Sequence, residues 1–180
     1  MTINDLFIRL TPYQPADKIQ MLFVLYRHYI TLSNSDESFD NFVFWGEMLL
    51  NDFDDVDKYV VNAKDLFTNI QDLKEIENRF SDILTETQIE FIRRFWDHFI
   101  PAMEKMQFVA LWKILYPLYK ALRDELKTKG IAYEGMIFRE VAEKAKQREE
   151  LHIPYNQVVF IGLNVLSTSE EMLMHRLKEL

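Results

Sequence analysis

The 180-residue chain contains no cysteine, four glycines and five prolines. The lack of cysteine excludes a disulfide framework, a thiolate zinc site and a cysteine nucleophile. The four glycines do not complete GxxxxGK[ST] or GxGxxG, so neither a P-loop nor a dinucleotide-binding loop is expected. Because glycine and proline are characteristic turn residues, their scarcity predicts that helices dominate the fold.

The chain also lacks the marks of secretion, of membrane insertion and of a basic DNA-binding surface. It begins MTINDLFIRL, without a basic region, and its longest uncharged stretch, 153–168, includes proline and polar residues. We therefore expect no signal peptide, no membrane span and a cytoplasmic location. The net charge of -8 argues against a dedicated nucleic-acid-binding module, because phosphate contacts need clustered Lys and Arg. The charge does not exclude such a role for a larger protein that contains this chain.

What the chain does contain is abundant aromatic and apolar sequence, with 14 Phe, 8 Tyr and 3 Trp. Apolar residues recur at steps of three and four, the spacing of one face of a helix. The inward faces are expected to be Ile19, Leu22, Phe23, Tyr26, Tyr29 and Ile30 in 15–32, the aromatic stripe Phe39, Phe42, Trp45, Leu49 and Phe53 in 38–53, Trp112, Leu115, Tyr119, Leu122 and Leu126 in 108–129, and Met136, Ile137, Val141 and Ala145 in 132–150. The pattern predicts a mainly α, multi-helix domain of six to nine helices. The helical segments are expected within 15–32, 38–53, 56–80, 85–101, 108–129, 132–150 and 167–180.

Individual residues predict where several helices begin and end. Pro15 is expected at the first helical position, where its missing N–H is not needed, and Ser38 is expected to cap the next helix. Pro117 should kink the segment 108–129, and Gly130 should end it. Ser167 is one of two candidates to cap the last helix, the other being Thr168.

An acidic run at 51–57 contains Asp52, Asp54, Asp55 and Asp57. A calcium-binding EF-hand loop needs glycine at its sixth position and glutamate at its twelfth. Counted from Asp52, those positions hold Asp57 and Ala63, so calcium is not expected. We interpret the run as acidic residues at a helix break, one of which caps the helix that follows.

Catalytic and metal-binding patterns are weak. The four histidines lie on separate segments, and the single ExxH, Glu149 to His152, is half of what a di-iron carboxylate bundle requires. No GxSxG serine motif is present. We therefore expect no catalytic residue, no cofactor and no metal. The histidines are His28, His98, His152 and His175.

The periodicity changes after Pro154. Residues 158–161 form a continuous apolar run, VVFI, that is typical of a buried strand in a parallel sheet. Only 6–10 offers another strand candidate, so the predicted strand lacks neighbours. We predict a helical domain at 1–153, followed at 154–180 by a strand and helix from the edge of an incomplete α/β domain.

Several segments together resemble part of a known protein family. They are residues 37–77, a tryptophan-bearing helix from Thr87 on, AYEGMIFREV at 132–141 and VVFIGLNVLSTSEEMLMHRL at 158–177. The resemblance is to the AddB-like helicase-nucleases, PD-(D/E)XK nuclease family proteins whose helicase-like region is related to UvrD and RecB. It implies that the chain is a fragment of that region, comprising a helical insertion and its return into a RecA-like domain.

The resemblance also implies partners and a role. Such proteins process double-strand DNA ends together with an AddA-like helicase-nuclease subunit. Related active helicases carry an acidic pair after the strand, which holds Mg²⁺ and polarises the attacking water. Gly162 and Leu163 stand at those positions, so the resemblance implies a non-catalytic piece that contributes to the DNA path or to the contact with the partner subunit.

Two other functions stay open at the level of sequence. One is an autonomous helical protein-interaction module with no nucleic-acid role, and the other is a metal-dependent carboxylate enzyme, which lacks its second ExxH. Binding of the isolated chain to DNA should be weak. The basic positions that are expected to contribute most to such binding are Arg93, Arg94, Lys144 and Lys146.

Overall fold

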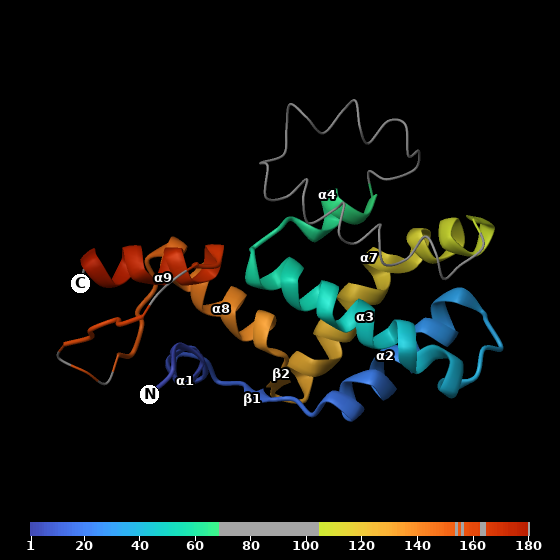
Figure 1. Ribbon diagram of the computed structural model, residues 1–180, viewed down its shortest axis with the longest axis horizontal. Coiled ribbons are helices and arrows are strands. Elements are labelled where there is room, and N and C mark those ends of the chain that lie inside the picture. The colour runs from blue at the N-terminus through green and yellow to red at the C-terminus, as the bar shows by residue number, and fades with distance from the viewer. Residues whose placement is uncertain (69–104, 154, 156, 163–164, 180) are drawn as a thin grey trace.

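The computed structural model describes residues 1–68, 105–153, 155, 157–162 and 165–179. Within them the fold is mainly helical, as predicted, and it has one two-stranded parallel sheet (Figure 1). The predicted helix at 85–101 lies outside the described residues, as do Arg93, Arg94 and His98. The described helices are α1 (Ile3–Arg9), α2 (Lys18–Ser33), α3 (Phe39–Lys58), α4 (Ala63–Thr68), α7 (Lys105–Thr128), α8 (Glu134–Gln147) and α9 (Thr168–Glu179).

Helix α1 replaces the strand that was considered for residues 6–10, so that candidate was wrong. Thr2 and Asp5 form a capping box, in which each side chain accepts a hydrogen bond from the backbone N–H of the other residue. Leu6, Phe7 and Leu10 are buried. Their spacing of one, three and four suits a short helix whose start is fixed by the cap.

The sheet joins the start of the chain to the connection between α7 and α8. Strand β1 (Gln14–Pro15) pairs in parallel with β2 (Ile131–Ala132), and the N–H of Gln14 donates to the carbonyl of Gly130 at 3.0 Å. The prediction that Pro15 opens a helix was therefore wrong. Helix α2 begins at Lys18, and the Asp17 side chain caps it by accepting from two backbone N–H groups.

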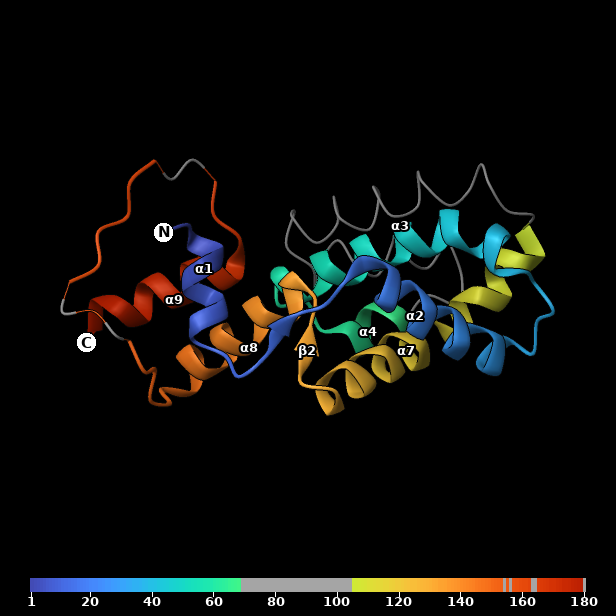
Figure 2. The ribbon, with the colours of Figure 1, turned by 90° about the horizontal axis from the view of Figure 1, so that it is seen from below.

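Helices α2, α3 and α7 pack together around one end of the core (Figure 2). The aromatic stripe of α3 is buried at Phe42, Trp45 and Phe53, and Ser38 caps the helix, as predicted. On α2 the inward face differs from the prediction. Ile19 and Phe23 are 62% and 54% exposed, whereas the predicted Leu22 and Tyr29 are buried together with Met21, Val24 and Leu25.

Helix α7 follows its predicted pattern. Leu115, Tyr119, Leu122 and Leu126 are buried, and Pro117 lies inside the helix. Gly130 has φ +69°, a left-handed conformation that glycine adopts readily, and its N–H donates to the carbonyl of Lys127 at 3.0 Å. The predicted stop signal is therefore confirmed.

Helix α3 runs without interruption from Phe39 to Lys58, so the break predicted at the acidic run 51–57 was wrong. The cause is tertiary. Asp57 is completely buried among basic and hydroxyl groups from α7 and α8, and Asp54 contacts the start of α8. These partners stabilise acidic residues in the last turns of a helix, where its dipole would otherwise disfavour them.

Helices α8 and α9 pack against each other at the end of the molecule that carries both termini (Figure 2). The predicted inward residues of α8 are all buried, namely Met136, Ile137, Val141 and Ala145. Ser167 caps α9, because its hydroxyl accepts from the N–H of Glu170 while the Glu170 carboxylate accepts from the N–H of Ser167.

The strand predicted at 158–161 is absent, so that prediction was wrong for this chain. Residues 157–161 are irregular, and the segment between α8 and α9 loops outward from the helices (Figures 1 and 2). The strands at 14–15 and 131–132 lie elsewhere and do not pair with it. A strand needs a hydrogen-bonded neighbour, and the described residues place none beside this segment.

Candidate functional site

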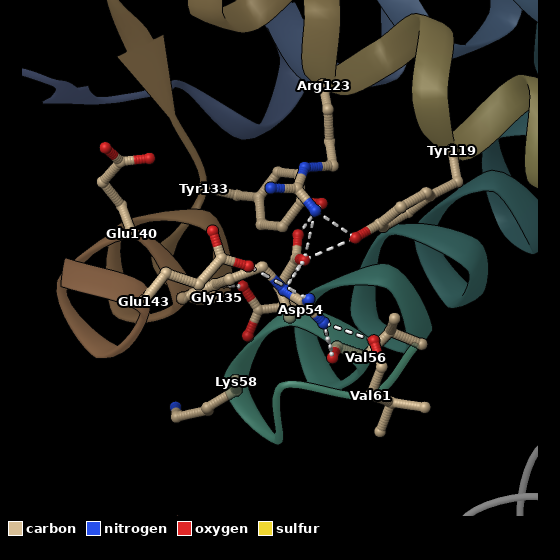
Figure 3. A network of polar contacts seen from close by, with 12 residues as sticks. Asp54, Val56, Lys58, Val61, Tyr119, Arg123, Tyr133, Gly135, Glu140 and Glu143 are labelled. Carbon is tan, nitrogen blue, oxygen red and sulfur yellow. Dashed lines mark hydrogen bonds and ion pairs between the residues drawn. The ribbon is translucent and has the colours of Figure 1, made fainter. Parts of the chain in front are cut away.

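A buried cluster of charged and hydroxyl side chains joins α3, α7 and α8 (Figure 3). At its centre is the Asp57 carboxylate, which has no exposed surface. Its Oδ1 accepts from the hydroxyl of Tyr119 at 2.5 Å and from Arg123 Nη1 at 2.7 Å, and its Oδ2 accepts from the hydroxyl of Tyr133. Arg139 Nε lies 2.6 Å from Oδ1 and forms a second ion pair. One carboxylate thus ties three helices together.

Arg139 extends this cluster to the end of α3. Its Nη2 donates to the carbonyl oxygens of Val56 and Val61, at 2.8 and 2.5 Å. The backbone after α3 turns sharply, and Val60 there has a φ of +54°. The guanidinium therefore adds a second hydrogen bond to the Val56 carbonyl, which already accepts from the N–H of Val61, and it also binds the Val61 carbonyl just beyond the helix.

The cluster is closed to substrates. Burial and the charge of Asp57 raise the pKa of the Tyr119 and Tyr133 hydroxyls, so both stay protonated and act as donors. Both carboxylate oxygens are already occupied, and neither reaches solvent. The arrangement stabilises helix packing and offers no free base, nucleophile or ligand position.

Sequence reasoning missed this cluster, although two signals for it are present. Arg139 lies three residues after Met136 and three before Ala142, so it falls on the apolar face of its helix. Asp57 follows Phe53 by four residues on the apolar face of α3. A charged residue at an inward position indicates a buried partner, because an unpaired buried charge is very costly.

A second polar contact fixes where α8 begins. The Tyr133 side chain does not cap α8, and Asp54 of α3 does so instead: its Oδ1 accepts from the N–H of Gly135 at 2.6 Å. The two backbones meet closely here, since a Cβ on Gly135 would lie 2.1 Å from the carbonyl oxygen of Asp54. Burial raises the pKa of Asp54 to about 6.

The predicted metal candidates are not brought together. Glu149 and His152 are both exposed after the end of α8, and His28 forms a partly buried pair with Glu125, its Nε2 lying 2.8 Å from the carboxylate. In the part of the chain that the structure describes, no group of three or more metal-binding side chains converges. His175 is exposed on α9.

Gly162, which the resemblance singled out, lies on the outward loop, and the basic positions Lys144 and Lys146 lie on α8. Gly162 is exposed with φ +79°, and Leu163 falls outside the described residues. Lys144 lies 3.7 Å from the Glu140 carboxylate, and Lys146 is exposed at the end of α8. Neither lysine is part of a basic cluster, because the acidic residues of α8 lie beside them.

The outward loop carries the largest concentration of exposed aliphatic side chains in the described chain. Val159, Ile161 and Val165 are 69%, 89% and 84% exposed. Exposure alternates along 157–161, because Val158 and Phe160 are partly buried while their neighbours face solvent. This alternation is the period-two pattern of a strand. We call residues 157–161 the apolar loop segment.

The backbone of the apolar loop segment has no hydrogen-bonding partner in the part of the chain that the structure describes. Residues 157–162 form no backbone hydrogen bond with any other described residue. A space of about 990 Å³ separates the segment from α9, and Val158, Phe160 and Met174 are among the residues around it. An exposed apolar stretch with unpaired N–H and C=O groups is the feature by which a chain adds a strand to another sheet.

Comparison with known proteins identified no relative: no family model, no curated protein and no solved structure matches the chain. Among the described helices, none is both long enough and apolar enough to cross a membrane.

Proposed function

We propose that this chain is a non-catalytic helical domain of a larger AddB-like DNA-repair helicase-nuclease subunit. Its role there is to shape the DNA path or to contact the AddA-like partner subunit. The apolar loop segment is the single observation that carries the proposal. It has the composition and the alternating burial of a strand, and no strand among the described residues pairs with it.

Leaving the apolar loop segment in water costs free energy. Two of its β-branched side chains, Val159 and Ile161, are mostly exposed, and burial of such a side chain contributes about 1.5–3 kcal/mol. Addition to a sheet would bury both and would pair the free backbone groups in one step. A neighbouring α/β domain of the same protein supplies such a sheet, and the resemblance implies a RecA-like one.

The absence of catalysis from this piece is supported at Gly162. This residue directly follows the apolar loop segment, where active relatives of the resembled family carry an acidic side chain. A glycine has no group that holds Mg²⁺ or polarises water. The net charge of -8 and the pairing of Lys144 with Glu140 favour weak DNA binding by this piece, so basic neighbours would supply the phosphate contacts.

Hydrogen–deuterium exchange tests the proposal. It compares the 180-residue chain with the protein encoded by the complete open reading frame. We expect peptides covering 157–161 to exchange freely in the 180-residue chain. In the complete protein they should slow by about a hundredfold or more, the effect expected of backbone groups that enter a stable sheet. Peptides from α8 should be protected equally in both samples and serve as the internal control.

Substitutions then connect the segment to function. In the complete protein, Ile161→Asp should impair DNA-end processing, whereas Phe44→Asp should not, because Phe44 is equally accessible, 72% exposed, but lies on α3. Free exchange of 157–161 in the complete protein would refute the proposal. An open reading frame that ends at Leu180, with no helicase or nuclease signature upstream, would refute it as well. Either result would favour the autonomous interaction module.

A further inference from the structure

A cavity of about 320 Å³ lies where α1, β1, α2, α3 and the start of α8 meet. Most of its wall is apolar and is contributed by elements far apart in the sequence. It adjoins the buried Asp57 cluster, because Tyr133 belongs to both, but Asp57 itself does not line it, and the apolar loop segment lies elsewhere. Its apolar side chains include Ile8, Met21, Leu50, Ile137 and Phe138. A volume of this size suits a small organic molecule.

Only one of the two carboxylate oxygens of Asp54, a residue of the cavity wall, has a hydrogen-bond partner among the described residues. Asp54 Oδ1 accepts from the N–H of Gly135 at 2.6 Å, and Asp54 lines the cavity. Its Oδ2 has no hydrogen bond or ion pair with any residue in the described ranges. This oxygen is therefore free to accept a hydrogen bond from a molecule in the cavity.

The other two charged side chains in the cavity wall, Glu134 and Lys18, are each paired with an oppositely charged residue. Glu134 accepts from Asn4 at 2.7 Å and from the ammonium group of Lys58. Lys18 pairs with Glu47 at 2.9 Å, outside the cavity. The Lys58 ammonium also attracts Asp54, but it is shared with Glu134, so these three side chains together carry one net negative charge. Burial raises the pKa of Asp54 to about 6, so the carboxylate is mostly ionised at neutral pH and is poorly solvated.

From this combination we infer that the cavity binds a small organic cation, a primary amine that carries a short apolar group. The ammonium group would donate to Asp54 Oδ2, and the apolar group would lie against Leu50 and Phe138. Charge complementarity fixes the sign of the ligand, and the apolar wall excludes a strongly hydrated inorganic cation. This inference is independent of the function proposed above.

A titration with 2-phenylethylamine tests the inference, and 2-phenylethanol is the neutral molecule of matching shape. The backbone amide signal of Gly135 in a ¹H–¹⁵N NMR spectrum is the reporter, because that N–H donates to Asp54. We expect the amine to shift this signal and to bind about tenfold more tightly than the alcohol, a difference of about 1.4 kcal/mol.

Three variants locate the binding. Asp54→Asn keeps an oxygen that can cap α8 but removes the charge, so it should abolish the preference for the amine. Asp40→Asn makes the same change at an exposed position of α3 and should behave like the wild type. Ala16 lines the cavity directly after β1, so Ala16→Leu places a larger side chain in the cavity without changing any charge. It should weaken binding of both molecules about tenfold.

Three results would overturn the inference. The first is an unmoved Gly135 signal at saturating amine, and the second is equal affinity for amine and alcohol. The third is unchanged binding in Ala16→Leu, which would place the amine at another site. Because Ala16→Leu leaves the Asp54 cap intact, it decides the matter even if Asp54→Asn disturbs the start of α8.

Discussion

Replacement of Asp57 by asparagine should remove a large part of the stability of the fold. Asparagine keeps one oxygen, but its NH₂ group then meets hydroxyl and guanidinium groups that are donors in the native protein. Arg123 and Arg139 lose their shared counter-charge, and their side chains are only 15% and 10% exposed. Breaking a buried ion pair by removing one partner costs about 3–5 kcal/mol.

That cost would be a substantial share of the free energy of unfolding, which is about 5–15 kcal/mol for a domain. The measurement is urea denaturation followed by circular dichroism at 222 nm, comparing midpoints at constant slope. Asp40→Asn, exposed on the same helix, is the matched control and should change stability by no more than about 0.5 kcal/mol.

A double-mutant cycle sharpens the test. In Asp57→Asn the unpaired Arg123 is part of the penalty, so adding Arg123→Met should cost less than the two single losses combined. A loss below about 1 kcal/mol for Asp57→Asn would show that the cluster does not hold the helices together. Strict additivity of the two substitutions would show that Asp57 and Arg123 do not act on each other.

Three further results are expected. Gly135→Ala should destabilise the protein by about 1–3 kcal/mol or more in the same urea assay, because the new Cβ would lie 2.1 Å from the Asp54 carbonyl oxygen. A variant as stable as the wild type would contradict the close approach of the α3 and α8 backbones at this point. Since the pKa of Asp54 is raised from 3.8 to about 6 in the folded state, the wild type should gain up to about 2 kcal/mol relative to Asp54→Asn as the pH falls from 7 to 4, and parallel pH profiles would refute the assignment. The isolated chain should bind a labelled DNA duplex with a dissociation constant of roughly 10⁻⁴ M or weaker at physiological salt, and micromolar, salt-sensitive binding in fluorescence anisotropy would make it a DNA-binding module in its own right.

The local sequence predicted the helices whose ends and faces are set by near neighbours. In α8 the inward residues Met136 and Val141 are buried as the spacing indicated, and in α7 the pattern of Leu115 and Leu122 holds. Gly130 ends α7 through its own left-handed backbone conformation. Such signals are readable because each depends on residues within one or two helical turns.

Predictions failed where the decisive partner was distant in sequence. The acidic run in α3 was expected to break the helix, but Asp57 is neutralised by Arg123 and Arg139, 66 and 82 residues later. The strand expected at 158–161 has the right composition and the right alternation of burial. Composition favours a strand, but a strand forms only where a second strand accepts and donates its backbone hydrogen bonds. No second strand among the described residues lies beside this segment.

By itself, therefore, the sequence determined a mainly helical fold, most of its apolar faces, and the absence of phosphate loops and thiolate sites. Tertiary structure alone decided where the inward charges go, how α3 continues to Lys58, and which carboxylate lies at the wall of a cavity. Periodicity records whether a position is buried, one residue at a time. The pairing of Asp57 with Tyr119 and Arg123, or of Asp54 with Gly135, depends on distances between helices that no local pattern encodes.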